Sequence, residues 1–365
     1  MSLAFEHVTL GQRVLFGSGR AAEHLAAEVS RLGAWKVMLI ASEFELPMAR
    51  QVASRIEVAL EHHDVVMHVP VEVAERARTA ATDAGIDLIV CVGGGSTTGL
   101  AKAVAMTTGT PILAVPTTYA GSEATNVWGL TEAARKTTGI DDKVLPATVI
   151  YDAELTLTLP VELSVASGLN GLAHCVDSLW GPRTDPINAA LAAEGIRALA
   201  QGLPLVKQDP AGPEGREQAL YGAYLAAVAF ASAGSGMHHK ICHVLGGTFN
   251  LPHAQTHATV LPYVLAFNAP HAPQAEARIA AAFGSGTALQ GLQDLRATLD
   301  APRALADYGF TEENIAEAVA VALPAIPATN PRPVTADNLT ALLAAALTGA
   351  DPATLTETAL QGAQR

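Results

Sequence analysis

The chain is poor in cysteine, aromatic residues and charge. Of its 365 residues, three are cysteines, 5% are aromatic and 16% are charged. An odd number of cysteines without a CxxC pair argues against a disulfide framework and indicates a reducing cytoplasm. Half of the chain is hydrophobic, mostly Ala, Leu and Val. Together with the scarcity of aromatic residues, this favours packed helices over a β-sandwich.

Basic residues and long apolar runs are also scarce. There are 22 Lys and Arg against 35 Asp and Glu, which gives a formal net charge of −13. Such a chain offers no positive field to nucleic acid or to an anionic membrane, so neither is expected as a partner. No uninterrupted apolar run reaches membrane-spanning length, and the start, MSLAFEHVTLGQ, lacks the pattern of a signal peptide. We expect a cytoplasmic protein.

The pattern of the chain changes at residue 160. Before it, expected helices over 19–32, about 47–61 and 72–84 alternate with expected strands at 13–17, 36–41, 65–69, 86–92, 111–116 and 147–152. This alternation predicts a doubly wound, mostly parallel, Rossmann-like sheet. After it, only Ala/Leu-rich helical segments follow, separated by Pro-containing breaks. We predict an α/β dinucleotide-binding domain over residues 1–159 and an all-helical catalytic domain over 160–365.

A glycine-rich turn, GGGSTTGLAKAVAM, follows the strongest predicted strand, residues 86–92. Gly93, Gly94 and Gly95 permit close approach of the backbone to a ligand, and Ser96 or Thr97 can cap the helix that follows. The N–H groups and the dipole at the start of that helix form an anion site, which suits the pyrophosphate of a dinucleotide. The motif is not GxGxxG, and a tight turn without a ligand is the alternative.

Two further polar elements are expected at the same edge of the sheet. Glu43 follows the 36–41 strand and could accept hydrogen bonds from a ribose hydroxyl, or it could be a surface carboxylate. A ribose contact would favour NADH, with NADPH also possible. The loop PTTYAGSEATN follows the 111–116 strand, and its Thr117, Thr118 and Ser122 can donate hydrogen bonds to the cofactor.

Five of the twelve histidines fall within residues 236–258, GMHHKICHVLGGTFNLPHAQTHA. His239 and His243 share one helical face, Gly246-Gly247 is expected to end or loosen that helix, and His253 is expected in the next turn. Converging imidazoles suit a metal, a proton donor or an oxyanion, whereas a lone histidine more often fills the surface or the core. Cys242 points away from His243 on a helix and is expected to be a packing residue.

Four stretches occur together and in one order: GGGSTTGLAKAVA, PTTYAGSEAT, GLNGLAHCVDSLW and the histidine cluster. Over essentially the whole chain they resemble the iron-containing (group III) alcohol dehydrogenase superfamily, and within it the maleylacetate reductase branch. The resemblance implies a dehydroquinate synthase-like architecture with a cleft between two domains, an NAD(P)H cofactor and a homodimer. It also implies that Lys136 lies near the cofactor ribose and His243 near the nicotinamide.

Metal-dependent members of that superfamily hold a divalent ion with one Asp and three His. The matching positions are Asn170, His174, His239 and His253. Asn170 replaces the only anionic ligand, and asparagine there is typical of the maleylacetate reductase branch. A hard cation loses its charged partner, although three histidines can still bind zinc. We therefore expect no metal.

The resemblance implies reduction of the C=C bond of maleylacetate, a small dicarboxylate, to 3-oxoadipate in aromatic-compound catabolism. His243 and His253 are then the leading candidates for proton donor and oxyanion donor. His174, His239 and Asn170 would line the same pocket, with protonated histidines supplying charge for the diacid. The alternatives are a metal-dependent alcohol or polyol dehydrogenase of the same superfamily, a non-redox lyase on the related fold, and a nucleotide-sensing module.

Overall fold

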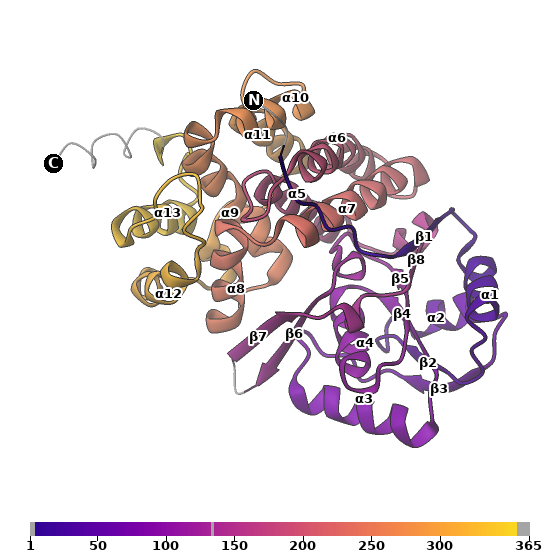
Figure 1. Cartoon of the computed structure of the whole chain (residues 1–365). Coiled ribbons are helices and arrows are strands. Elements are labelled where there is room, and N and C mark those ends of the chain that lie inside the picture. The colour runs from indigo at the N-terminus through magenta and orange to yellow at the C-terminus, as the bar shows by residue number, and fades with distance from the viewer. Residues whose placement is uncertain (1–3, 133–134, 356–365) are drawn as a thin grey trace. The chain divides into compact units, whose positions relative to one another are not determined.

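A computed structural model of the chain describes residues 4–132 and 135–355, with only the backbone described for residues 135 and 136. The described residues form two compact units, one α/β and one helical (Figure 1). The α/β unit comprises Thr9–Pro160 and Asp209–Leu220. The helical unit comprises residues 4–8, Val161–Gln208 and residues 221–355. Two segments therefore differ from the division expected at residue 160. Residues 4–8 belong to the helical unit, and Asp209–Leu220 belong to the α/β unit.

Six parallel strands form the main sheet of the α/β unit, in the order β1-β8-β5-β4-β2-β3. They are β1 (Arg13–Phe16), β2 (Val37–Ile40), β3 (Val58–His62), β4 (Leu88–Gly93), β5 (Ile112–Pro116) and β8 (Thr148–Tyr151). The predicted doubly wound parallel sheet is confirmed. From β2 the chain moves outward to β3, and from β4 it moves the other way, toward β5 and β8. The strand order thus reverses between β2 and β4, where sheets of this kind bind ligands at the carboxyl ends of the strands.

Four helices cover the two faces of this sheet. One face carries α1 (Ala21–Leu32) and α2 (Leu46–Val52), and the other carries α3 (Val71–Ala84) and α4 (Gly95–Thr108) (Figure 1). In β4, Val90 packs toward the first pair of helices and Cys91 toward the second. Because β4 is buried on both faces, its sequence is continuously apolar. Cys91 is accordingly a packing residue.

Residues 47–69 fold differently from the prediction. The expected helix over 47–61 ends at Val52, and the third strand is β3 rather than residues 65–69. Residues 65–69 include His68 and Val69 with φ of 66° and 49°, which a strand does not accommodate. The strand at 58–62 lies at the sheet edge with alternating burial, so its sequence lacks the continuous apolar run that marks the central strands.

The sequence also gives no clear signal for an antiparallel hairpin, β6 (Val127–Glu132) and β7 (Arg135–Ile140). Its polar residues and Gly129 and Gly139 interrupt the apolar alternation that marks a strand. The hairpin is tied to the loop before α3, because the Thr131 N–H donates to the Val69 carbonyl at 3.1 Å. Across the hairpin, Trp128 lies over Gly139, where a Cβ would approach its ring to 2.5 Å.

The second unit is helical, as predicted, and its described residues contain no strand. Its helices are α5 (Val161–Ser178), α6 (Pro186–Gln208), the larger part of α7 (Pro213–Ala233), α8 (Met237–Phe249), α9 (His253–Asn268), α10 (Pro273–Phe283), α11 (Ala288–Leu299), α12 (Ile315–Ala322) and α13 (Ala336–Thr348). None of the described helices alone has the length and apolar composition to cross a membrane, and only α7 and α8 taken together, with a 100° bend between them, reach those limits.

Helix α8 is longer than the sequence predicts. It continues through Gly246-Gly247 and ends at Asn250, whose φ is 55°. Met237, Ile241 and Leu245 recur every four residues and pack into one core with α9, α12 and α13. This burial outweighs the cost of about 1 kcal/mol that each glycine imposes on a helix. His253 is the first residue of α9 and does not lie in the expected turn.

Candidate active site

The glycine-rich turn lies between β4 and α4, where the strand order reverses. Gly93 has a φ of +154°, and a Cβ there would lie 2.4 Å from Thr97 Oγ1 and 2.7 Å from Glu45 Oε2. A Cβ at Gly94 would lie 3.0 Å from Thr118 Cγ2. Position 93 therefore requires glycine, and position 94 accommodates glycine better than a residue with a side chain.

Gly94 is the N-cap of α4, and no side chain caps this helix. The predicted capping by Ser96 or Thr97 is therefore wrong, because both residues lie inside the helix. Gly95 begins the helix, and a Cβ there would make only an ordinary contact with Ala120, at 3.5 Å. Uncapped N–H groups at a helix start, next to a glycine turn, fit the pyrophosphate of a dinucleotide.

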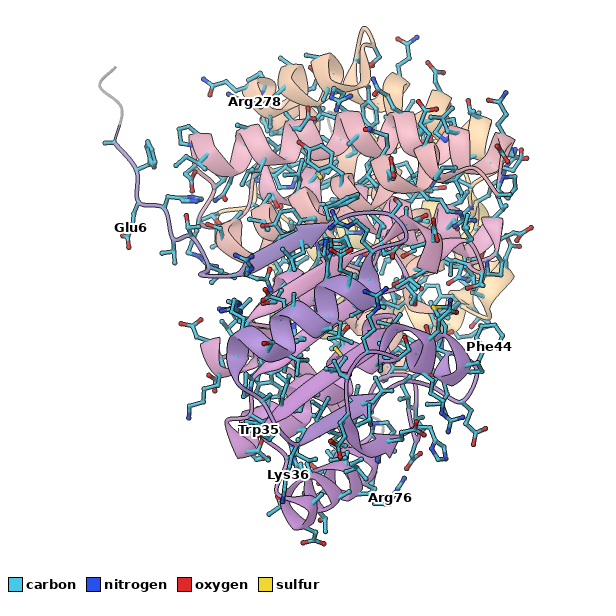
Figure 2. All side chains as sticks on the ribbon, turned by 90° about the vertical axis from the view of Figure 1, so that its right-hand side faces the viewer. Glu6, Trp35, Lys36, Phe44, Arg76 and Arg278 are labelled. Atoms are coloured by element: carbon cyan, nitrogen blue, oxygen red, sulfur yellow. The ribbon has the colours of Figure 1, made fainter. Side chains whose placement is uncertain are left out.

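A carboxylate lies beside this turn, but it belongs to Glu45, which the sequence did not single out. Its two oxygens accept hydrogen bonds from Ser42 Oγ at 2.8 Å and from Thr117 Oγ1 at 2.7 Å. Glu43, the residue expected there, has a side chain that is 84% exposed and 3.9 Å from His63 Nε2. Its neighbour Phe44 is also exposed, on the outside of the unit (Figure 2). A cofactor contact of Glu43 stays a prediction.

The polar loop after β5 lies against the glycine turn, as its place in the sheet implies. The Thr117 N–H donates to the Gly93 carbonyl at 3.2 Å. A buried lysine of α4 holds the far end of the loop, because Lys102 Nζ donates to the carbonyls of Ser122 at 2.6 Å and Thr125 at 2.8 Å. Burial lowers the pKa of Lys102 to about 7. The sequence reading missed Lys102, although a lysine within the apolar run GLAKAVA is a usable signal.

Lys136 belongs to β7, but its side chain lies outside the described residues. Its expected place near the cofactor ribose stays a prediction.

In the helical unit, three helices bring histidines together: His174 from α5, His238, His239 and His243 from α8, and His253 and His257 from α9. The rings of His174 and His239 stack with centroids 4.8 Å apart. The rings of His243 and His253 are 6.4 Å apart and nearly parallel. His257, for which the sequence predicts no role, lies 4.9 Å from His239 and 4.4 Å from His253. The expected convergence of these histidines is therefore present.

Four nitrogens of the cluster are buried without a hydrogen-bond partner among the described residues: His174 Nδ1, His238 Nδ1, His239 Nε2 and His257 Nε2. The same holds for Asn170 Oδ1, one helical turn before His174 on α5. Leaving one such group unpaired costs about 1–3 kcal/mol. Several together, on residues that share contacts, are typical of a functional site rather than of an ordinary core.

Burial disfavours positive charge on these imidazoles. It lowers the pKa of His174 to about 4 and that of His238 to about 3, and it lowers the pKa of His239 and His257 well below the usual value. The charged form loses its hydration in the interior, and the neighbouring imidazoles add to this effect for all but His174. Burial therefore disfavours the positive charge that this cluster was expected to offer a diacid, and it favours the neutral form of His174 and His239.

Asp177, which the sequence did not single out, orients His239. It is fully buried on α5, and its Oδ2 accepts from His239 Nδ1 at 2.8 Å and from the Gly236 N–H at 2.9 Å. A Cβ at Gly236 would lie 2.5 Å from Asp177 Oδ1, so glycine makes room for the carboxylate. Burial raises the pKa of Asp177 to about 6, which leaves it mostly ionised at neutral pH. A carboxylate only accepts, so Nδ1 of His239 carries the proton and Nε2 the lone pair.

Both units match one family of known proteins. The iron-containing alcohol dehydrogenase family matches residues 11–153, and the C-terminal region of the Fe-containing alcohol dehydrogenase family matches residues 164–347. The chain belongs to the iron-containing alcohol dehydrogenase family. It is accordingly an oxidoreductase, which confirms the enzyme class expected from the sequence.

Within the iron-containing alcohol dehydrogenase family, the chain is similar to maleylacetate reductases. It is 44% identical to maleylacetate reductase from Sphingobium indicum over 96% of this chain and 100% of that protein. The solved structure of maleylacetate reductase from Rhizobium sp. strain MTP-10005 is 43% identical, with a TM-score of 0.90 over 96% of this chain and 99% of the other. The solved structure of an iron-containing alcohol dehydrogenase from Corynebacterium glutamicum is 71% identical, with a TM-score of 0.96 over 97% of this chain and 100% of the other.

The family's metal invites a test of the four matched positions. Within the part of the chain that the structure describes, one group of His, Cys, Asp or Glu has all its donor atoms within 4.8 Å: His238, Cys242 and His257. It includes none of the matched histidines, and His238 Nε2 and His257 Nδ1 already form a hydrogen bond of 3.0 Å. The fourth matched position, Asn170, is uncharged. This arrangement does not fit the family's ion at the matched positions.

Proposed function

We propose that this member of the iron-containing alcohol dehydrogenase family reduces the C=C bond of maleylacetate to 3-oxoadipate with NADH, and that it does so without a metal. The observation that carries the proposal is similarity to maleylacetate reductases over nearly the full length of both chains. Asn170, in place of a carboxylate at the matched ligand position, supports the metal-free reaction.

The reaction needs a hydride, an acceptor for negative charge and a proton. When bound, NADH would supply the hydride for the alkene carbon β to the ketone. The electron pair of the C=C bond then moves toward the ketone oxygen and forms an enolate. Imidazole N–H groups stabilise the enolate oxygen, and a proton delivered to the α carbon completes the reduction.

His243 and His253 are the members of the cluster suited to touch the substrate. Both are partly exposed, whereas His174, His238, His239 and His257 are buried. We assign to His243 and His253 the donation of a hydrogen bond to the enolate oxygen and of the proton to carbon. His253 begins α9, so it projects from the first turn of the helix.

The glycine turn supports NADH as the hydride donor. Gly93 and Gly94 keep the backbone clear of Cβ atoms beside the uncapped start of α4, as a bound pyrophosphate requires. Glu45 is fixed at the same edge by Ser42 and Thr117. A carboxylate beside the cofactor would disfavour the 2′-phosphate of NADPH through charge repulsion, so we expect NADH to be preferred.

The decisive assay follows NADH consumption with maleylacetate, with and without EDTA. We expect maleylacetate-dependent oxidation of NADH that chelation leaves unchanged. Activity lost with EDTA and restored by Fe²⁺ or Zn²⁺ would establish the metal-dependent reaction that the name of the Corynebacterium glutamicum relative suggests. Conversion of a substrate without net NADH consumption would point to the lyase alternative.

Asp177→Asn is expected to lower kcat for maleylacetate by about 10- to 100-fold, by analogy with the loss of partners that orient metal-bound histidines. The amide NH₂ can face Nδ1 of His239 and reverse its tautomer. Steady-state kinetics and the ¹⁵N shifts of the His239 ring measure the two effects.

Asp185→Asn is the matched control for this variant. Asp185 is also buried in the helical unit, bonds a histidine (His7 Nδ1, 2.9 Å) and caps the start of α6 through Ile187 and Asn188, but it makes no described contact with the cluster. Equal losses of kcat in the two variants would mean that general destabilisation explains the effect and that Asp177 has no role through His239.

A further inference from the structure

His238 and His257 form a buried pair to which the proposed reaction assigns no role. Both side chains are fully buried, and His238 Nε2 lies 3.0 Å from His257 Nδ1. One ring donates and the other accepts, so the bond fixes the orientation of both. Cys242 lies one helical turn after His238, with Sγ 3.6 Å from Nε2, and is buried in the helical core, as expected of a packing residue.

His257 is also in contact with the rings that the reaction uses. Its centroid is 4.4 Å from that of His253, one turn earlier on α9, and 4.9 Å from that of His239 on α8. It lies 6.4 Å from His243 as well. Protein interiors are close-packed, so a ring in this position limits how its neighbours can turn.

We propose that His257, held by its hydrogen bond to His238, is a positioning residue that sets the ring orientations of His253 and His239. This inference rests on the proposed reductase function. The pair acts through its neighbours and does not touch the substrate, because His238 Nδ1 and His257 Nε2 are both enclosed by protein atoms.

The geometry of the bond supplies two pairs of matched variants. At position 257 the bonding atom is Nδ1, which the amide of asparagine approximates, whereas glutamine places its amide near Nε2. At position 238 the bonding atom is Nε2, so glutamine places its amide near the bonding atom and asparagine does not. His257→Asn and His238→Gln should keep the link, while His257→Gln and His238→Asn should break it.

We expect the two link-breaking variants to lower kcat for maleylacetate by about 10- to 100-fold with little change in KM for NADH. Each link-keeping variant should retain at least about fivefold more activity than its partner at the same position. Equal kcat within both pairs, or kcat near wild type in the link-breaking variants, would overturn the proposal. If one variant of a pair does not fold, as judged by thermal unfolding, the pair at the other position carries the test.

A second readout separates this inference from the function on which it rests. Ring NMR resonances of His253, recorded without substrate, should move in His238→Asn and stay near their wild-type positions in His238→Gln, because both variants keep the His257 ring beside His253. Wild-type protein that fails to reduce maleylacetate would refute the proposed function, while the resonances would still test positioning. Unmoved His253 resonances in His238→Asn would refute positioning even in a fully active reductase.

Discussion

Replacing His253 or His243 with alanine is expected to lower kcat for maleylacetate by about a hundredfold to ten-thousandfold, the range for loss of a positioned proton donor. In the proposed reaction, charge builds up on the ketone oxygen, and the partly exposed imidazoles of these two residues are its donors. Because both groups act in the transition state, kcat should fall more than KM rises. Steady-state kinetics with NADH and maleylacetate measure both quantities.

His271→Ala is the control for these variants. His271 lies in the same unit, at the surface between α9 and α10, and its loss should leave kcat unchanged. The assignment of His243 and His253 fails if both alanine variants retain kcat near that of the wild type. If one variant alone loses activity, that residue carries both the proton and the hydrogen bond to the enolate.

Gly93→Ala is expected to weaken NADH binding by roughly a hundredfold, equivalent to about 2.8 kcal/mol at 1.4 kcal/mol per factor of ten. Two effects add. The backbone at φ +154° is unfavourable for a residue with a side chain, and the new Cβ would overlap Thr97 and Glu45. The turn must shift, and the N–H groups at the start of α4 shift with it. Fluorescence titration with NADH gives the dissociation constant without requiring the substrate.

Substitutions at two other glycines serve as controls for Gly93→Ala. A Cβ at Gly95 would make an ordinary contact of 3.5 Å, so Gly95→Ala should cost less than Gly93→Ala. Gly11→Ala adds a Cβ with nothing within 4 Å, in the same unit, and should leave NADH binding unchanged. Equal affinities for NADH in Gly93→Ala and Gly11→Ala would show that the glycine turn does not bind the cofactor.

The sequence was most informative where local pattern and burial agree. The run before Gly93 is apolar without interruption because β4 is buried on both faces, so both the strand and the turn after it were predictable. The change to Ala/Leu-rich helices near residue 160 likewise predicted the helical unit. The spacing of His239 and His243 placed them on one helix, and the four stretches in one order indicated the family.

The edges of the elements were less predictable, because distant residues decide them. Residues 58–62 are a strand since they pair with β2, and α8 continues through Gly246-Gly247 since its apolar face packs against α9, α12 and α13. Local propensity alone favoured a different ending in both cases. His253 likewise begins a helix and does not lie in the expected turn.

For the candidate site, the sequence by itself determined which residue types are available: a glycine turn, a second polar loop, and a cluster of histidines next to Asn170. Tertiary structure alone decided how they are used. It placed Glu45 beside the turn, fixed His239 with Asp177, put His257 against both His239 and His253, and lowered the pKa of the buried imidazoles. The physical reason is that periodicity and turn propensity depend on neighbours in the chain, whereas hydration, hydrogen-bond partners and ring contacts depend on residues that only folding brings together.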